Sequence, residues 1–285
     1  MTIISRFAPS PNGYLHLGHA YAAWCAYDLC RAAGGRFLLR IEDIDGLRCR
    51  PEYEAPIFED LAWLGLAWEE PVRRQSDHLA DYADALSALQ AMSVVYPCYC
   101  SRREIREEIA SSANAPQGPD GPLYPGTCRG LTSEERAAKV AAGLPAAWRL
   151  DIASATARVG DDLAWQDQVA GEQPCLANIQ GDVVLARKDI GTSYHLSVVV
   201  DDALQGVNLV TRGEDLFAST HVHRLLQALL DYPVPVYHHH RLIEDEHGVR
   251  LAKRHGAEPI RDFRARGLSP SDLRRQLGLP IAGQG

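Results

Sequence analysis

The chain has 285 residues and a formal net charge of −8 at pH 7, with 46% hydrophobic and 23% charged residues. This composition is ordinary for a globular enzyme with one large or two to three small domains. The negative charge argues against broad electrostatic capture of nucleic acid, which needs clustered Lys and Arg. No apolar run is long enough to span a bilayer, and residues 1–6 lack a signal-peptide layout, so we expect a cytoplasmic protein without a membrane partner.

Residues 6–19 predict a strand, a break and the start of a helix. Pro9 and Pro11 disfavour helix in their neighbours, and Gly13 permits a sharp turn. Helical periodicity follows, so the helix should start near Leu17. Because the first N–H groups of a helix have no intrahelical partner and its dipole favours anions, this junction is typical of a phosphate site.

Two histidines, His16 and His19, lie three residues apart at this helix start, so both can face one bound triphosphate. Gly18 has no side chain that would keep a ligand away from the backbone. A His-x-Gly-His segment on its own is at least as often an ordinary proline-rich loop with two surface histidines.

The preceding residues favour the phosphate site. Residues 6–11, Arg-Phe-Ala-Pro-Ser-Pro, followed by Gly13, resemble the lead-in to the HIGH motif of class I aminoacyl-tRNA synthetases, specifically the glutamyl branch. The resemblance implies that Arg6 and Ser10 contribute to glutamate binding. It also implies ATP binding by Pro9, His16, Gly18 and His19, with His16 and His19 as catalytic residues.

Residues 18–33 predict a helix that ends at two glycines, and residues 37–41 predict a buried strand that leads into Glu42. A strand, helix, strand order at this spacing indicates a parallel βαβ unit with its ligand beyond the carboxyl ends of the strands. Glu42 should therefore lie near His16, and we assign it to glutamate binding. The predicted fold class is α/β, with a Rossmann-like nucleotide-binding domain and a parallel sheet.

The rest of the chain predicts two more helices, an insertion and a return of the nucleotide-binding fold. The insertion is indicated by a loss of helix-strand alternation between Tyr96 and about Cys175. Helices are predicted at 51–64, 77–92 and 216–230, and strands at 183–185, 194–200 and 207–211. The expected divisions are 1–95 and 176–232 for the two catalytic halves, 96–175 for the insertion, and 233–285 for a mostly helical C-terminal region.

Cys98, Cys100 and Cys128 offer three thiolates within the irregular insertion, and thiolates suit a tetrahedral structural zinc site. The alternative is buried or free cysteines, and the fourth position stays open on chemistry alone. The pattern Cys-x-Cys followed by Tyr-x-x-x-Cys resembles the zinc ligands of the glutamyl-queuosine tRNA(Asp) synthetases. That resemblance implies one structural Zn²⁺ held by Cys98, Cys100, Tyr124 and Cys128. The other cysteines, Cys25, Cys30, Cys49 and Cys175, are expected to be packing residues.

Tyr194 and Arg212 begin or end the returning strands, so both can lie at the rim of the crevice. Residues 211–216 resemble the Arg-Gly-x-Asp-Leu segment of the glutamyl family. An arginine fork matches a carboxylate bidentately, so Arg212 would select glutamate over glutamine, and the resemblance places Tyr194 in the same pocket. For an isolated arginine a surface ion pair would be the better interpretation. Asp201 and Asp202 serve the amino group or end a strand, and both interpretations stay open.

Residues 250–254, Arg-Leu-Ala-Lys-Arg, resemble the KMSKS loop, in which the second lysine stabilises the departing pyrophosphate. Lys253 takes that position as a catalytic and ATP-binding residue. Arg250 and Ala252 depart from the motif, and Ala252 removes a hydroxyl donor. Residues 238–240 are three histidines, but in an extended segment their side chains alternate, which argues against a metal site.

A basic stretch near the C-terminus offers either a nucleic-acid contact or a solvated helix face. Its arginines are Arg261, Arg264, Arg266, Arg274 and Arg275. Residues 254–285, which follow Lys253, are fewer than the roughly 50 that a separate domain needs. We therefore expect no anticodon-binding domain of the kind found in full glutamyl-tRNA synthetases.

Together these resemblances imply that glutamate and ATP, assisted by Mg²⁺, form glutamyl-adenylate without tRNA. The glutamyl group would then pass to the cyclopentenediol of queuosine at the wobble position of tRNA(Asp), and we expect a monomer. One alternative is a truncated glutamyl-tRNA synthetase that charges the 3′ end of tRNA. Another is a noncatalytic RNA-binding relative, which only Arg250 and Ala252 support.

Overall fold

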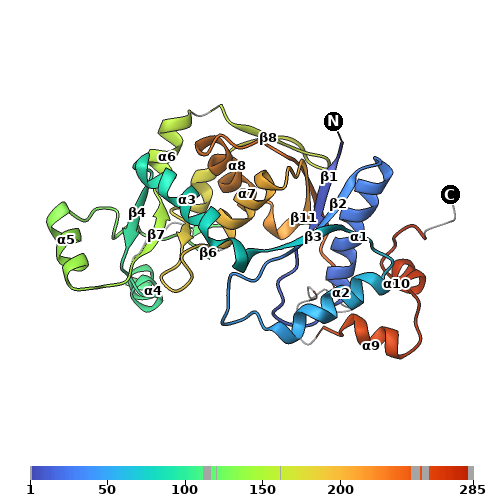
Figure 1. Cartoon of the computed structure of the whole chain (residues 1–285). Coiled ribbons are helices and arrows are strands. Elements are labelled where there is room, and N and C mark those ends of the chain that lie inside the picture. The colour runs from blue at the N-terminus through green and yellow to red at the C-terminus, as the bar shows by residue number, and fades with distance from the viewer. Residues whose placement is uncertain are drawn as a thin grey trace.

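The computed structural model describes residues 2–111, 117–119, 121–160, 162–244, 251 and 257–281. Within these ranges, seven strands form the main sheet, and neighbouring strands are parallel except for the last pair (Figure 1). In spatial order they are β3 (Glu69–Arg74), β2 (Arg36–Ile41), β1 (Ile4–Phe7), β11 (Leu209–Gly213), β12 (Val236–His240), β8 (Ala164–Asp167) and β9 (Gly171–Pro174).

The alternation of side chains on β2 separates two cores on the two faces of the sheet. Phe37, Leu39 and Ile41 pack with the first group of helices, whereas Arg40 points to the opposite face and bonds to a residue of α7. The first group consists of α1 (Leu17–Ala32), α2 (Glu54–Trp63), α9 (Ile260–Ala265) and α10 (Pro270–Gln276). The second consists of α3 (Leu79–Ala91), α6 (Ile152–Val159), α7 (Tyr194–Leu204) and α8 (Ser219–Leu229).

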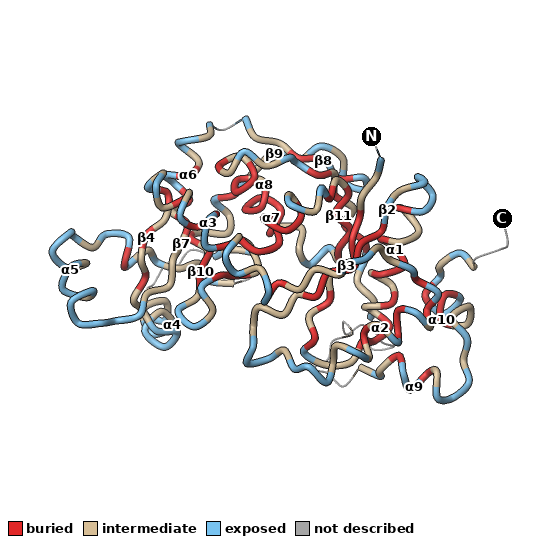
Figure 2. Tube along the Cα trace, viewed as in Figure 1, coloured by how far each residue is buried: buried red, intermediate tan, exposed pale blue. Residues whose placement is uncertain are grey.

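A small antiparallel sheet in the order β10-β7-β4 lies at one end of the molecule (Figure 1). Strand β10 comes after residues 96–175, whereas β8 and β9, which fall within this range, belong to the main sheet, so only part of 96–175 forms the separate insertion. Helices α4 and α5 of the insertion contain no buried residue, in agreement with their exposed traces in Figure 2. The elements here are β4 (Val95–Cys98), α4 (Arg102–Ser111), β5 (Gln117–Gly118), β6 (Gly121–Pro122), α5 (Ser133–Ala141), β7 (Ala147–Leu150) and β10 (Val184–Ala186). Short 3-10 helices are η1 (Pro51–Tyr53), η2 (Gln75–His78), η3 (Ala177–Gln180) and η4 (Glu214–Leu216).

The predicted α/β fold is confirmed: β1, α1 and β2 form the expected parallel βαβ unit. The predicted strand at 194–200 is wrong, because this segment begins helix α7. Residues 196–202 are buried without interruption, so the helix shows no polar face to reveal a 3.6-residue period. A short run of valines that is buried on all sides does not distinguish strand from helix by sequence pattern.

Each of the C-terminal arginines contacts a neighbouring group in the described part of the chain, and the choice between a solvated helix face and a nucleic-acid contact stays a prediction. Arg274 forms a two-point ion pair with Asp28 of α1, and its guanidinium also lies over Trp24. The other contacts are Arg261 over the Tyr14 ring, Arg264 with Glu59 and Asp60, Arg266 with Glu258, and Arg275 with Asp272. No helix in the described ranges is both long and apolar enough to cross a membrane.

Candidate active site

The start of α1 is closed by its two histidines. His16 is the N-cap residue, and its Nδ1 accepts the backbone N–H of Gly18 at 3.1 Å. The Nδ1 of His19 accepts the backbone N–H of His16 at 3.2 Å, which completes a reciprocal cap. Because each Nδ1 is an acceptor, the neutral rings carry their hydrogen on Nε2, where it can serve as a donor.

Gly18 leaves room for the capping ring of His16. A Cβ at position 18 would lie 3.0 Å from Cε1 and 3.1 Å from Nδ1 of His16, so any side chain would press on the capping ring. The helix start, with its oriented N–H groups, faces a cavity of about 640 Å³. Lining residues include Pro9, Ser10, Asn12, His16, Gly18, His19, Arg48 and His240.

A second cavity, of about 300 Å³, adjoins the first. Ser10, Asn12 and Arg48 line both. Glu42 and Tyr194, two residues assigned to glutamate from the sequence, line the second cavity. The geometry thus places a small polar compartment beside a larger one at the mouth of α1, which suits two substrates that must react with each other.

Arg212 lies behind Tyr194 and is 6% exposed. Its Nη1 donates to the Tyr194 hydroxyl at 3.4 Å, which connects it to the second cavity. Burial raises the pKa of Tyr194, although the nearby Arg212 opposes this. The tyrosine hydroxyl therefore stays protonated at neutral pH and can donate a hydrogen bond.

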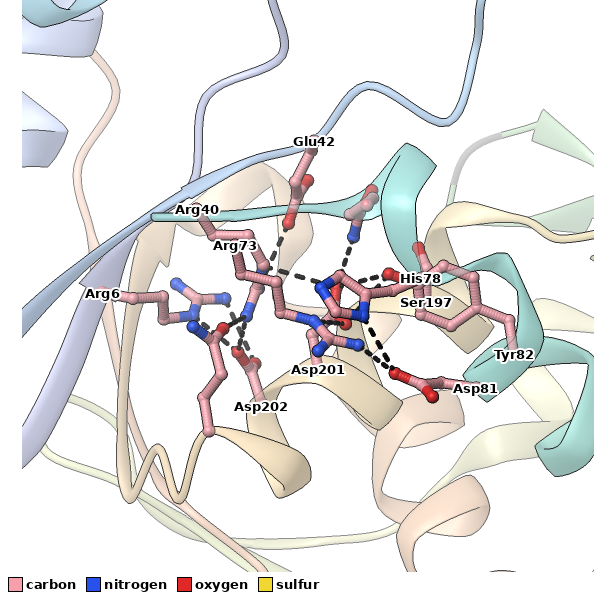
Figure 3. A network of polar contacts seen from close by, with 12 residues as sticks. Arg6, Arg40, Glu42, Arg73, His78, Asp81, Tyr82, Ser197, Asp201 and Asp202 are labelled. Carbon is pink, nitrogen blue, oxygen red and sulfur yellow. Dashed lines mark hydrogen bonds and ion pairs between the residues drawn. The ribbon is translucent and has the colours of Figure 1, made fainter. Parts of the chain in front are cut away.

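Arg6 and Arg40 share a single carboxylate, that of Asp202 (Figure 3). Arg6 Nε and Nη2 donate to the two oxygens of Asp202 at 2.9 and 3.3 Å, and Arg40 Nη1 donates to one of them at 2.8 Å. Arg40 also reaches Glu42, with Nη2 and Oε1 3.2 Å apart. Glu42, which lines the second cavity, is thus connected through Arg40 to a buried network that also contains Arg6 and Asp202.

The charges of this network set the protonation of its carboxylates. Burial acts to raise the pKa of Asp202, but Arg6 and Arg40 outweigh it, so the pKa is lowered. For Glu42 burial is the largest influence and raises the pKa, while Arg40 and Arg6 oppose it. Asp202 is therefore the fixed negative charge of the network.

Asp201, the residue before Asp202, belongs to the same network and is completely buried. It accepts hydrogen bonds from Arg73, Gln75 and Tyr82, which join α7 to β3 and α3 (Figure 3). The alternative that the two aspartates end a strand is wrong, because both lie within helix α7, and a role toward the amino group of the substrate stays a prediction. Both connect α7 to elements that border the site.

The three insertion cysteines converge as predicted. The Sγ atoms of Cys98, Cys100 and Cys128 lie within 4.8 Å of one another, and the Tyr124 hydroxyl is 3.4 Å from Cys98 Sγ and 3.6 Å from Cys100 Sγ. Zinc–sulfur bonds of about 2.3 Å imply ligand separations near 3.8 Å in a tetrahedron, which these distances approach. Burial raises the pKa of Cys100 to about 11, and a bound divalent cation would counter it by favouring the thiolate. The cluster can hold a metal ion.

Most of the predicted site residues meet at one edge of the parallel sheet, at the carboxyl ends of β1, β2 and β11. The predicted loop residues Arg250, Ala252 and Lys253 lie outside the described residues. Sequence reasoning missed Arg40, and it set His239 aside when a metal site was rejected. A charged residue within an otherwise apolar strand was the available signal for Arg40.

The fold and the paired cavities define the catalytic domain of a class I tRNA synthetase. The family model described as tRNA synthetases class I (E and Q), catalytic domain, matches residues 2–280. A Glutamyl-Q tRNA(Asp) synthetase from Rhodobacter capsulatus is 52% identical over 97% of this chain and 100% of its own length. One from Symbiobacterium thermophilum is 45% identical over 95% of this chain and 84% of its own. The chain belongs to the glutamyl-Q tRNA(Asp) synthetase family of ligases.

A solved structure supports the same placement. The glutamate tRNA ligase of Elizabethkingia meningosepticum, solved in complex with its amino acid, superposes with a TM-score of 0.75 at 27% identity. The match covers 90% of this chain and 53% of that ligase, so the ligase has a large region beyond the part shared here.

Proposed function

We propose that the protein activates glutamate with ATP, without tRNA, and transfers it to the cyclopentenediol of queuosine at the wobble position of tRNA(Asp). The observation that carries the proposal is the pair of adjoining cavities, one at the mouth of α1 and one bordered by Glu42 and Tyr194. ATP occupies the first and glutamate the second. Names of the full-length relatives support the tRNA substrate.

In this reaction the α-carboxylate of glutamate attacks the α-phosphorus of ATP, and pyrophosphate leaves. The Nε2–H groups of His16 and His19, with the helix N-terminus, neutralise phosphate charge as it develops. Lys253 stabilises the departing pyrophosphate, and Mg²⁺ accompanies ATP. No nucleophilic side chain is needed, since adenylate formation is mostly positioning and charge neutralisation.

Glutamate is recognised at its two ends. Arg212, reached past Tyr194, binds the side-chain carboxylate and rejects glutamine, because a guanidinium fork has only donors to offer. Glu42 and Ser10 line the second cavity beside the remainder of the amino acid. Arg6, assigned to glutamate from the sequence, lines neither cavity, and it acts on the site through its ion pair with Asp202 of α7. One structural Zn²⁺, which orders the insertion, is held by Cys98, Cys100, Tyr124 and Cys128. The reaction takes place in the cytoplasm.

Glutamate-dependent exchange between ATP and labelled pyrophosphate, measured without tRNA, tests the activation step. We expect exchange with glutamate and none with glutamine. Lys253→Ala should slow exchange far more than it weakens glutamate binding. No exchange by a folded, zinc-replete preparation would exclude this function and favour the noncatalytic relative.

The transfer step is tested with labelled glutamate and two forms of tRNA(Asp), with and without queuosine. Label is expected only on the queuosine-containing form, and periodate treatment of the diol should prevent it. Labelling of tRNA(Glu) at its 3′ end would instead identify a truncated glutamyl-tRNA synthetase.

A further inference from the structure

Arg212 is a buried cation whose hydrogen bonds all end on neutral groups. Nε donates to His239 Nε2 at 3.1 Å, and Nη2 donates to the Thr220 hydroxyl at 2.6 Å. Nη1 lies 3.0 Å from His223 Nδ1 and 3.4 Å from the Tyr194 hydroxyl. Within the described part of the chain, no carboxylate forms an ion pair with Arg212. A buried guanidinium in such surroundings favours an anionic ligand.

The bond to Arg212 fixes the tautomer of His239. Arginine has only donors, so the Nε2 of His239 must present its lone pair to Arg212 Nε. Its hydrogen is then on Nδ1, which lies 2.7 Å from Asp167 Oδ2 and donates to it. The Thr220 hydroxyl accepts from Arg212 Nη2 and has one hydrogen, which it can donate either to this Nε2 at 3.2 Å or to the carbonyl of Leu216 at 3.4 Å. Burial and the charge of Arg212 lower the pKa of His239 to about 4, so the ring is neutral.

Asp167 is itself held in a single orientation by the hairpin that joins β8 and β9. Its Oδ1 accepts the backbone N–H groups of Val169 and Ala170, both at 2.8 Å. Its Oδ2 accepts the backbone N–H and the ring Nδ1 of His239. Both oxygens therefore face donors, and an amide at this position would turn its NH₂ group toward one pair of them.

We propose that Asp167 and His239 are positioning residues that hold Arg212 for the side-chain carboxylate of the amino acid substrate. This inference rests on the proposed function, in which Arg212 binds glutamate. A neutral imidazole between Asp167 and Arg212 keeps the balancing negative charge one ring away from the guanidinium. The guanidinium is thereby fixed in direction without a carboxylate that would compete with the substrate.

Arg6 shows the contrasting arrangement within the same site. Its guanidinium is paired directly and at two points with Asp202, so its charge is already matched inside the protein. Arg212 is instead connected to the carboxylate of Asp167 through the ring of His239. The difference assigns carboxylate selection to Arg212 and makes the His239 tautomer part of that selection.

Asp167→Asn is the decisive substitution. The amide oxygen is expected to remain with the two backbone N–H groups of the hairpin, which leaves NH₂ facing His239 Nδ1. That nitrogen must then accept, so the hydrogen moves to Nε2 and opposes the N–H of Arg212. We expect the KM for glutamate in pyrophosphate exchange to rise by about tenfold or more, with little change in the KM for ATP.

A purely structural role for Asp167 predicts a different result, namely lower stability with an unchanged KM for glutamate. Glu172→Gln in the same hairpin is the matched control, because it removes an exposed carboxylate that is not bonded to this chain of residues. His239→Gln provides the rescue: a glutamine oxygen can accept from Arg212 without any choice of tautomer. Asp167→Asn should therefore raise the KM for glutamate by a much smaller factor in the His239→Gln background than in the wild type. Equal increases in KM in both backgrounds would overturn the proposal.

Nitrogen NMR of labelled histidine tests the tautomer without any activity measurement. The His239 signal is assigned by its loss in His239→Gln. At pH 7 the wild-type ring should carry its hydrogen on Nδ1, and in Asp167→Asn on Nε2. A wild-type ring with hydrogen on Nε2, or on both nitrogens, would overturn the inference even if Asp167→Asn does not fold. Absence of exchange in the wild type, with the Nδ1 tautomer intact, would instead refute the proposed function and leave the arrangement around Arg212 standing.

Discussion

Arg6 of β1 and Asp202 of α7 form a two-point buried ion pair, with distances of 2.9 and 3.3 Å. The same carboxylate also accepts a hydrogen bond from Arg40 of β2. One aspartate therefore joins two neighbouring strands of the sheet to the helix that carries Tyr194, a residue that lines the candidate glutamate cavity.

Asp202→Asn should destabilise the protein by about 3 kcal/mol, because it leaves two buried guanidinium groups without their shared counter-charge. Chemical denaturation at pH 7 measures the free energy of unfolding. Asp28→Asn is the control, since it breaks the Arg274 pair at a half-exposed carboxylate and should cost about 1 kcal/mol or less. Equal losses in the two variants would contradict the central role of Asp202.

Arg212→Lys should raise the KM for glutamate by about tenfold or more while leaving the KM for ATP nearly unchanged. Lysine keeps the charge but cannot match the several directions in which the guanidinium donates. Pyrophosphate exchange at varied glutamate and varied ATP separates the two constants. Arg224→Lys on α8 is the matched control, because Arg224 donates to the carbonyl of Ala164, which lines neither cavity, whereas Arg212 donates to Tyr194, which lines the second.

Asp60→Asn should stabilise the protein at neutral pH. Among the described residues, both carboxylate oxygens of Asp60 are buried without a hydrogen-bond partner, and Arg264 lies 3.9 Å from one of them. Burial raises the pKa of Asp60 to about 6. Because the folded-state pKa is raised, the stability associated with the protonated form is present below about pH 4 and is lost as pH rises to about 6. Asp60→Asn should thus raise the free energy of unfolding by an amount on the order of 2 kcal/mol at pH 8, and by little at pH 4.

Denaturation of the wild type and Asp60→Asn at both pH values checks the sign of this effect. Asp84→Asn, on the exposed face of α3, is the control and should change stability little at either pH. A gain that is the same at pH 4 and pH 8 would show that removal of the buried charge is not its cause.

The cysteine cluster predicts a metal content of about one zinc ion per chain in protein purified without chelators. Cys100→Ser should lose the metal and expose the insertion to proteolysis, since the metal crosslinks a segment with few buried residues. Elemental analysis and limited proteolysis provide the measurements. Cys175→Ser should retain the metal, because Cys175 bonds to the carbonyl of His221 far from the cluster; full zinc in Cys100→Ser would remove this residue from the ligand set.

The sequence alone determined the features that depend on neighbouring residues. The prolines and glycine before Leu17 predict the start of α1, and close spacing predicts the convergence of Cys98 with Cys100. The order of strand and helix predicts the parallel βαβ unit and its ligand edge. These signals are local, because backbone restrictions, helix ends and metal-ligand spacings act over a few residues.

Only the tertiary structure decided what depends on contacts between distant segments. Residues 194–200 have the composition of a strand, but they lie in helix α7, whose hydrophobic residues between 196 and 200 pack in the second core against residues from distant parts of the chain. Asp202 meets Arg6 across 196 positions, and Asp167 meets His239 across 72. The sequence offers no period or motif for such pairs, because they depend on which charged groups the folded sheet and helices bury next to each other.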